Sequence, residues 1–348
     1  MQEVAKRAGV ALSTVSYALN GTRPISDETR QRILRAMDEL GYQPHAMARG
    51  LASKRTRIIA LLFPASGRGL GATALEIVTG AAGAARAMGY HLVVWSTEAH
   101  GVDELRSLLS QGLVDGVVVM RVRLRDDRID LLRTMDVPFS MIGRTASTAD
   151  VNFADIDYDQ TTGEAVDYLV GLGHRKIAFL NHSRESFEAG YGPSVRAAGG
   201  FESAVRSAGL EPIMWLCDDA PQAGRQALDE LLVLHPDLTA LVAMNELAIV
   251  GVMHAIRERG WRVPDDLSIM SLVSAVQTAE MTMPPLTAMT PPYDELGRLG
   301  VDVLIERLER QAAGRPRPLQ GLLPCRLVVR GSTAPPRAAI ATPAAARG

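Results

Sequence analysis

The chain begins with QEVAKRAGVALSTVSYALNG at residues 2–21, and this stretch decides the fold of its N-terminal part. Apolar residues recur at helical spacing on both sides of Gly9: Val4, Ala5 and Ala8 lie at i, i+1 and i+4, and Val15, Ala18 and Leu19 lie at i, i+3 and i+4. This spacing predicts two short helices with one apolar face each, joined by a tight turn at the glycine. The two apolar faces can pack on each other.

A third helix is expected after the loop that follows residue 21. Ser26 is a good N-cap residue, the two acidic residues after it suit the positive first turn, and Gly41 marks the end. We expect this helix to bury Ile33, Met37 and Leu40. Three short helices then share one small core.

The second helix leaves a polar surface without a carboxylate. The side chains on this surface are Leu12, Ser13, Thr14, Ser16 and Tyr17. A helix that reads base edges in the DNA major groove needs contact groups of this kind, so we expect a helix-turn-helix whose second helix is the recognition helix. The alternative is a generic three-helix unit with solvated charges.

Charge is divided unevenly along the chain. Residues 1–57 hold ten Lys and Arg against five Asp and Glu, a balance of +5, which leaves −7 for the remainder of a chain whose total is −2. A small basic N-terminal unit on an acidic body indicates that nucleic acid contacts the N-terminal unit alone.

Four short motifs carry a resemblance to a known family. They are VAKRAGV at 4–10, STVS at 13–16, NG at 20–21 and LGYQPHAMARGL at 40–51. Together they resemble the head and hinge of the LacI/GalR family of bacterial repressors, and the resemblance continues through most of the chain. Ala11 stands where the family usually has a Ser that caps the recognition helix, and such a replacement costs about 1 kcal/mol. We therefore expect the head to order fully only on DNA.

The resemblance also implies a hinge. Residues 44–55, with Ala48 among them, would form a helix on the operator, pair with the hinge of a second copy and insert Leu51 into the minor groove, where apolar wedges kink DNA. The alternative is a linker without structure. For contacts with backbone phosphate we expect the basic side chains Arg7, Arg23, Lys54 and Arg55.

From residue 58 the pattern changes to apolar strands alternating with helices. The first series has strands at 58–63, 92–95, 117–120, 139–142 and 151–156 and helices at 73–88, 103–111 and 128–135. The second begins with a helix at 159–172, and continues with strands at 177–180, 213–216, 241–243 and 267–272 and helices at 195–208, 222–234 and 246–259. Continuous apolar strands between helices indicate doubly wound parallel sheets covered on both faces.

The fold class is therefore α/β, with a helix-turn-helix head at 1–43, a hinge helix at 44–55 and a two-lobed sensor at 56–333 that resembles periplasmic binding proteins. We expect the first lobe to take about 56–180 and 290–318, including a helix at 293–310. The second lobe would take about 181–289 and 319–333, with a last strand at 322–329. Residues 334–348 are rich in Pro and Ala, which predicts a disordered tail. The tail has no leucine heptads, so we expect no tetramer-forming helix.

Composition suggests a soluble globular protein, with 47% hydrophobic and 22% charged residues. No apolar run reaches the length that spans a membrane, and no apolar signal core is present, so we expect a cytoplasmic protein. The two cysteines, Cys217 and Cys325, have no metal or redox spacing, which indicates reduced thiols and no structural zinc.

No catalytic motif is found, and no cofactor is expected. His174 lies in a helix-to-strand link, where we expect a basic residue that satisfies helix-end carbonyls. Residues 66–71 read SGRGLG after a strand, but this is neither G-x-G-x-x-G nor a P-loop. A flexible loop at the lip of a cleft is the better interpretation than a dinucleotide site.

Ligands of doubly wound lobes bind at the carboxyl ends of the strands. The residues just after the expected strands are Phe63, Ser66, Ser96, Arg121, Arg123, Asp157, Asn181, Asn245 and Glu246. The resemblance implies that Asp157, Arg196, Asn245 and Tyr293 hold or stack on a sugar. Val273 stands where sugar-responsive relatives have a carboxylate for vicinal hydroxyls, so we expect a less hydroxylated, anionic or modified ligand.

These features favour a homodimeric repressor that binds a pseudo-palindromic operator and responds to a sugar or related metabolite. Two alternatives belong to other classes. A solute-binding protein of a transport system would have a signal peptide and no head. An NAD-dependent oxidoreductase would need the dinucleotide fingerprint that residues 66–71 lack.

Overall fold

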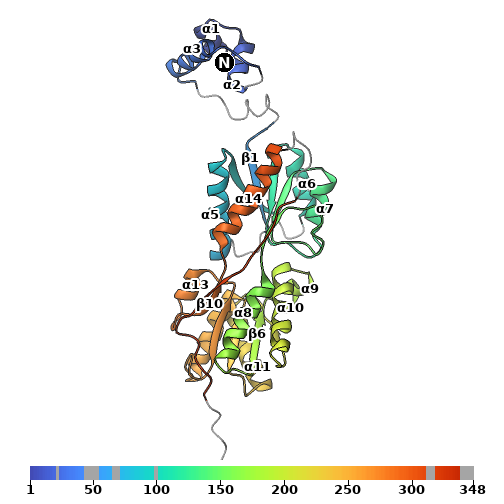
Figure 1. The fold of residues 1–348 in the computed structure, drawn as a ribbon, viewed down its shortest axis with the longest axis vertical. Helices are drawn as coiled ribbons and strands as arrows, with labels where there is room; N and C mark the ends of the chain where they lie inside the picture. Colours follow the sequence, from blue (N-terminus) through green and yellow to red (C-terminus); the bar gives the residue numbers. More distant parts are fainter. Residues whose placement is uncertain (21–22, 43–54, 65–70, 98–100, 311–317, 338–348) are drawn as a thin grey trace, which may run out of the picture.

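The structure is a computed structural model and describes residues 1–20, 23–42, 55–64, 71–97, 101–310 and 318–337. The N-terminal unit consists of α1 (Gln2–Ala8), α2 (Leu12–Asn20) and α3 (Asp27–Glu39) (Figure 1). Gly9 ends α1 with a left-handed φ of 63°, and the next N–H, of Val10, donates to the Ala5 carbonyl at 3.0 Å. The predicted helix-turn-helix is confirmed.

The core of the head is small and apolar. Val4, Val15 and Ile33 are fully buried, one from each helix. Leu40 was expected in this core, but it lies 43% exposed, because α3 ends at Glu39 and the inward position is taken by Ala36. The expected cap at Ser26 is present: its hydroxyl accepts from the Thr29 N–H at 3.3 Å.

The first lobe is built on a sheet of six strands in the order β11-β5-β4-β3-β1-β2. All its pairs are parallel. The strands are β1 (Ile58–Pro64), β2 (His91–Thr97), β3 (Gly116–Val119), β4 (Phe139–Ile142), β5 (Phe153–Ile156) and β11 (Gln320–Leu323). The helices are α5 (Ala72–Ala87), α6 (Val102–Ser110), α7 (Asp127–Thr134) and α14 (Tyr293–Arg310).

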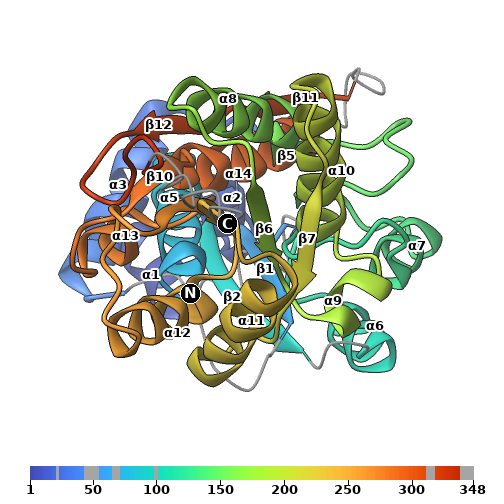
Figure 2. The ribbon, with the colours of Figure 1, turned by 90° about the horizontal axis from the view of Figure 1, so that it is seen from below.

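The second lobe has a second six-stranded sheet, in the order β12-β10-β9-β8-β6-β7, with β12 antiparallel to β10. Its strands are β6 (Ile177–Asn181), β7 (Ile213–Leu216), β8 (Ala240–Ala243), β9 (Ser268–Leu272), β10 (Thr287–Thr290) and β12 (Arg326–Val328). Its helices are α8 (Tyr158–Gly171), α9 (Arg184–Glu188), α10 (Gly192–Ser207), α11 (Pro221–Leu234), α12 (Glu246–Glu258) and α13 (Val276–Glu280). In Figure 2, β6 lies between α8 and α11.

The side chains of the central strands point alternately to the two faces of the sheet, which explains why helices cover both faces. Ile59 and Leu61 of β1 face the core shared with α5 and α14, whereas Ala60 and Leu62 face α6 and α7. Successive side chains of a strand point to opposite faces, so an uninterrupted apolar run serves two cores. The doubly wound architecture predicted from these runs is confirmed.

The lobe boundaries differ from the expected ones. The chain enters the second lobe at Tyr158, so residues 158–180 belong there and not to the first lobe. It returns between β10 and α14, and it crosses a third time between β11 and β12. The single expected strand at 322–329 is therefore two strands in two sheets, a division that the apolar pattern does not reveal because both halves are apolar.

Residues 334–337, the described part of the expected disordered tail, are bonded to the second lobe. The Ala334 N–H donates to Ser268 Oγ at 3.1 Å, and Arg337 pairs with Asp266. The Ala334 carbonyl also accepts from the buried His174 ring at 3.0 Å, so His174 joins the tail to Thr239 and does not cap a helix. Arg175 contacts the helix-end carbonyl of Val170 instead. Residues 338–348 lie outside the described part.

Among the described helices, none combines the length and apolarity needed to cross a membrane.

Candidate functional site

The surface of α2 has the character expected of a recognition helix. Leu12 is 45% exposed, Ser13 is exposed, and Thr14, Ser16 and Tyr17 are half-buried around the buried Val15. The guanidinium of Arg23 lies 5.4 Å from the centroid of the Tyr17 ring. This arrangement places a cation beside the polar face of α2.

The other candidate phosphate contacts have different surroundings. Arg7 pairs with Glu39 at 2.6 Å, and both side chains are more than half exposed, so solvent screens the pair. Arg55 points to the body: it donates to the Leu308 carbonyl at 2.7 Å and lies 3.4 Å from Glu309. The structure therefore places Arg55 at the end of α14. Ala48, Leu51 and Lys54 fall outside the described residues.

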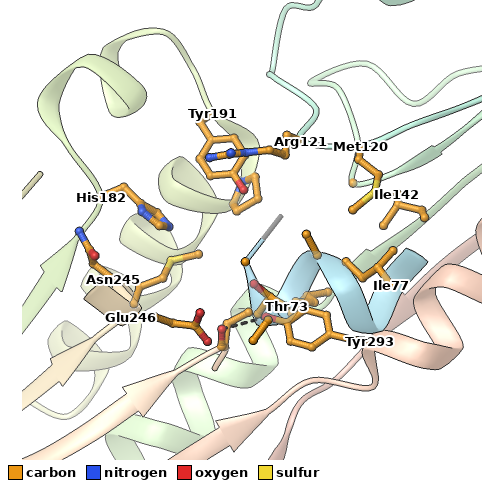
Figure 3. Close-up of a pocket in the computed structure, with 18 of the residues that line it drawn as sticks. Thr73, Ile77, Met120, Arg121, Ile142, His182, Tyr191, Asn245, Glu246 and Tyr293 are labelled. Carbon is orange, nitrogen blue, oxygen red and sulfur yellow. Dashed lines mark hydrogen bonds between the residues drawn. The ribbon is translucent and has the colours of Figure 1, made fainter. Parts of the chain in front are cut away.

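A cavity of about 490 Å³ lies between the two lobes. Its first-lobe wall includes Ile77, Met120, Arg121 and Ile142 (Figure 3). The second-lobe wall includes His182, Tyr191, Asn245 and Glu246. The volume falls within the range of small-molecule sites, and a cleft between domains is a common place for one.

Six of the twelve candidate effector residues line this cavity: Phe63, Arg121, Asn245, Glu246, Val273 and Tyr293. They come from the carboxyl ends of the strands and from the start of α14. Asn245 has little left to offer a ligand, because its side chain donates to the Cys217 carbonyl at 2.9 Å and accepts from the Ala248 N–H at 3.0 Å. It caps α12 and fixes the wall.

Five other candidates do not line the cavity. Two of them are Ser96 and Asn181, and the Asn181 side chain donates to the Ser194 carbonyl at 3.0 Å. Asp157 caps α8 by accepting from the Gln160 N–H at 3.0 Å. Arg123 forms a backbone bridge with Tyr191 across the lobes. Arg196 donates to the carbonyls of Arg144 and Thr145 at 2.9 and 3.1 Å, so its guanidinium joins the lobes and does not face the cavity. Ser66 lies outside the described residues.

A charged cluster forms part of the cavity wall, because Asp155 lines the cavity. Asp155 is 4% exposed, and its Oδ2 atom lies 3.4 Å from Arg144 and 3.9 Å from Arg196. Burial raises the pKa of Asp155 to about 6, although both guanidinium groups oppose the rise. Burial likewise lowers the pKa of Arg196.

The second-lobe wall carries two acceptor groups. Nδ1 of His182 lies 3.0 Å from a carboxylate oxygen of Asp219. A carboxylate only accepts, so Nδ1 donates and the other ring nitrogen of a neutral imidazole is an acceptor. Glu246 accepts from Ser274 Oγ at 3.1 Å and from the Ala275 N–H at 2.9 Å, both on Oε1.

Several cavity residues were not among the candidates. His182 and Asp219 follow β6 and β7 closely, so the strand-end rule could have found them. Tyr158 follows β5 just as closely, whereas Tyr191 lies just before α10 and has no such signal. Burial raises the pKa of both phenols, and of Tyr293, above its usual value, so all three stay neutral near pH 7.

Comparisons with known proteins agree with this geometry. Residues 1–45 match the bacterial regulatory proteins of the lacI family, and residues 166–333 match the periplasmic binding protein-like domain. The HTH-type transcriptional regulator DegA of Bacillus subtilis (strain 168) is 32% identical over 346 residues, which cover 96% of this chain and 97% of DegA. The chain belongs to the LacI family of bacterial regulators.

Solved structures of LacI-family proteins share the whole fold. The lac repressor dimer bound to operator and the anti-inducer ONPF has a TM-score of 0.79 and 26% identity, covering 95% of this chain and 98% of that one. The complex of the transcriptional regulator CelR with cellobiose has a TM-score of 0.73 and 27% identity, with the same coverage.

Membership of the LacI family decides the broad function. The chain is a DNA-binding transcriptional regulator with a periplasmic-binding-protein-like effector domain, and it is not an enzyme. The expectation of a regulator is thus confirmed, and the oxidoreductase alternative is excluded. The match of residues 1–45 to the lacI family also argues against a transport protein.

Proposed function

We propose that this protein is a sequence-specific repressor whose operator affinity is controlled by a small molecule bound between its two lobes. The observation that carries the proposal is the 490 Å³ cavity, because residues of both lobes line it. A ligand that contacts both lobes favours one lobe arrangement by its differential contacts, and only such a difference moves the equilibrium.

Two copies of the chain would bind a pseudo-palindromic operator in the cytoplasm. Leu12, Ser13, Thr14, Ser16 and Tyr17 would face base edges, and Arg7 and Arg23 would lie near phosphates. The operator-bound dimer of the lac repressor supports this arrangement, and the cellobiose complex of CelR supports a small-molecule effector. The hinge contacts of Ala48, Leu51 and Lys54 belong to the same proposal.

Two exposed leucines of the head provide a matched test. Leu12 on α2 is 45% exposed, and Leu34 on α3 is 53% exposed. An operator is first selected from random duplexes with the full chain, and affinities of both Ala variants are then measured by fluorescence anisotropy. Leu12→Ala should change the preferred bases and weaken the selected site, whereas Leu34→Ala should bind like the wild type. Equal effects of the two variants would contradict the assignment of α2.

A further inference from the structure

Two residues that line the cavity hold left-handed backbone without being glycine. Arg121 has a φ of 53° and Val273 a φ of 59°. This region costs most residues on the order of 1–3 kcal/mol, and it is rarer still for a β-branched side chain such as valine. Strain of this kind gathers at ligand sites, so both side chains are candidates for contact with the ligand.

Arg121 is held from behind by a buried ion pair. The guanidinium of Arg128 pairs with Asp126 at 2.7 Å and donates to the carbonyls of Met120 and Arg121 at 3.2 and 3.1 Å. These bonds fix the backbone that carries Arg121 at the end of β3.

The Arg121 guanidinium itself lies close to two aromatic rings. It is 5.8 Å from the Phe63 centroid and 5.5 Å from the Tyr191 centroid (Figure 3). The guanidinium also hydrogen-bonds with the Tyr191 side chain. A guanidinium has five N–H donors in a planar fork, and this fork matches the two oxygens of a carboxylate. The cavity thus contains a cation positioned before the ligand arrives.

Val273 contributes to an apolar wall. Its backbone is fixed because its N–H donates to the Met289 carbonyl at 3.0 Å and its carbonyl accepts from Tyr293 Oη at 2.9 Å. Its side chain offers no hydrogen bond, and Ile77 and Ile142 extend the same apolar lining. A hydroxyl held against such a wall loses its hydration without a partner, at a cost of about 1–3 kcal/mol.

The second-lobe wall of the cavity presents hydrogen-bond acceptors, so a ligand that binds there needs hydrogen-bond donors. His182 and Glu246, described above, present acceptor atoms from the second lobe. Figure 3 shows Arg121 and Glu246 on opposite sides of the space, with Ile77 and Ile142 at another side. A ligand that satisfies all three walls has an acid at one end, an apolar body and a donor at the other end.

From these walls we infer that the ligand of the proposed effector site is a ring-containing carboxylic acid that carries a hydroxyl or amino group across the ring, and not a neutral polyhydroxylated sugar. Arg121 binds the carboxylate, Val273 and the isoleucines contact the ring, and His182 and Glu246 accept from the donor. The inference rests on the proposed function of the cavity.

The test uses the full chain and matched compounds in isothermal titration calorimetry. The probe is 4-hydroxybenzoate, with its alicyclic counterpart 4-hydroxycyclohexanecarboxylate. Compared with the probe, 4-hydroxybenzamide lacks the negative charge and benzoate lacks the hydroxyl donor. Glucose and cellobiose represent neutral sugars. We expect the acids with a donor to bind, and the amide to bind about ten- to hundred-fold more weakly, as the loss of a charge-assisted contact predicts.

Variants separate a specific site from general attraction of anions. Arg121→Met keeps most of the length of the side chain but removes its charge. It should lower the affinity for 4-hydroxybenzoate to that for 4-hydroxybenzamide. Arg123→Met removes a charge from the same loop at a residue that does not line the cavity, and it should leave binding unchanged. Val273→Asp places a carboxylate beside the ring and should lower acid affinity further.

Three results would overturn the inference: tighter binding of glucose or cellobiose than of any acid, unchanged acid affinity in Arg121→Met, or no heat from any ring acid at millimolar concentration. The proposed function is judged separately in the same samples. If a neutral sugar alters operator affinity, the function stands and only the ligand class falls. If the unliganded chain selects no operator, the function itself fails.

Discussion

The hydroxyl of Tyr293 donates to the main-chain carbonyl of Val273 at 2.9 Å. Tyr293 begins α14 of the first lobe, whereas Val273 follows β9 of the second, so the bond joins the two lobes at the cavity wall. Both residues are buried, at 6% and 8% exposure. A lobe movement that separates Tyr293 from Val273 breaks this bond, and its free energy then enters the equilibrium that a ligand shifts.

Tyr293→Phe should lower the free energy of unfolding by about 1 kcal/mol, since it removes one buried hydrogen bond and leaves a carbonyl unpaired. It should also change the ligand concentration that gives half of the operator response. Urea unfolding and an operator titration measure the two effects. Tyr168→Phe is the control, because Tyr168 bonds Thr333 at 2.8 Å within the second lobe. An equal change of the ligand response in both variants would contradict the role of the interlobe bond.

Arg196→Ala should destabilise the protein even without ligand. The sequence suggested that Arg196 contacts the ligand, but its guanidinium joins α10 to two carbonyls of the first lobe and neutralises Asp155. Removal of one partner from a buried charged group costs about 3 kcal/mol. Urea unfolding of the unliganded protein measures the loss. Arg206→Ala on the same helix breaks an exposed pair with Glu202 and should cost less than about 1 kcal/mol.

Arg196 illustrates which parts of the candidate site can be predicted from the sequence and which cannot. The strand-end rule located four cavity residues, because parallel strands end at one edge wherever the apolar runs are clear. The family resemblance added Val273 and Tyr293. The direction of a long side chain such as Arg196 depends on which carbonyls the other lobe leaves unpaired, and no sequence pattern records that. The same holds for Arg55, whose guanidinium turns to Leu308 at the distant end of α14.

The positions where the chain crosses between the lobes were not predicted correctly from the sequence. The apolar run predicts one strand at 322–329, yet Leu323 pairs with β5 of one sheet and Leu327 with β10 of the other. A strand's sheet is decided by which neighbours its backbone meets, and this is long-range information. The fold of the head was easier to predict from the sequence. Gly9 ends α1 and Ser26 caps α3 through hydrogen bonds to nearby residues, and a short motif specifies such local bonds.

Asp155→Asn should remove a pH dependence of stability. The pKa of Asp155 is raised by burial to about 6 in the folded protein, above its ordinary value. A raised pKa means that the folded state holds the proton more tightly, so the stability it contributes is complete below about pH 4 and is lost as pH rises through about 6. The wild type should therefore lose about 2 kcal/mol relative to Asp155→Asn between pH 4 and pH 6.

Urea unfolding at a series of pH values tests this difference. Asp150→Asn is the matched control, because Asp150 is an exposed carboxylate on the loop before β5, and Asn tolerates its left-handed φ of 58°. The control should follow the wild type at every pH. A constant difference between the wild type and Asp155→Asn from pH 4 to 6 would show that Asp155 does not titrate in this window.

Gly297→Ala should separate two helices that build the cavity wall. A Cβ atom at Gly297 in α14 would lie 2.1 Å from the Ile77 carbonyl oxygen of α5, and backbone cannot move aside as a flexible side chain does. Overpacking of this kind costs about 1–3 kcal/mol. Because Ile77 and Tyr293 belong to these helices, ligand affinity should fall as well. Gly83→Ala in α5 meets no atom within 4 Å and should stabilise the helix by up to about 1 kcal/mol. Thermal unfolding of both variants with calorimetric titration measures the contrast, and equal stability of Gly297→Ala and the wild type would show that α5 and α14 pack less closely than described.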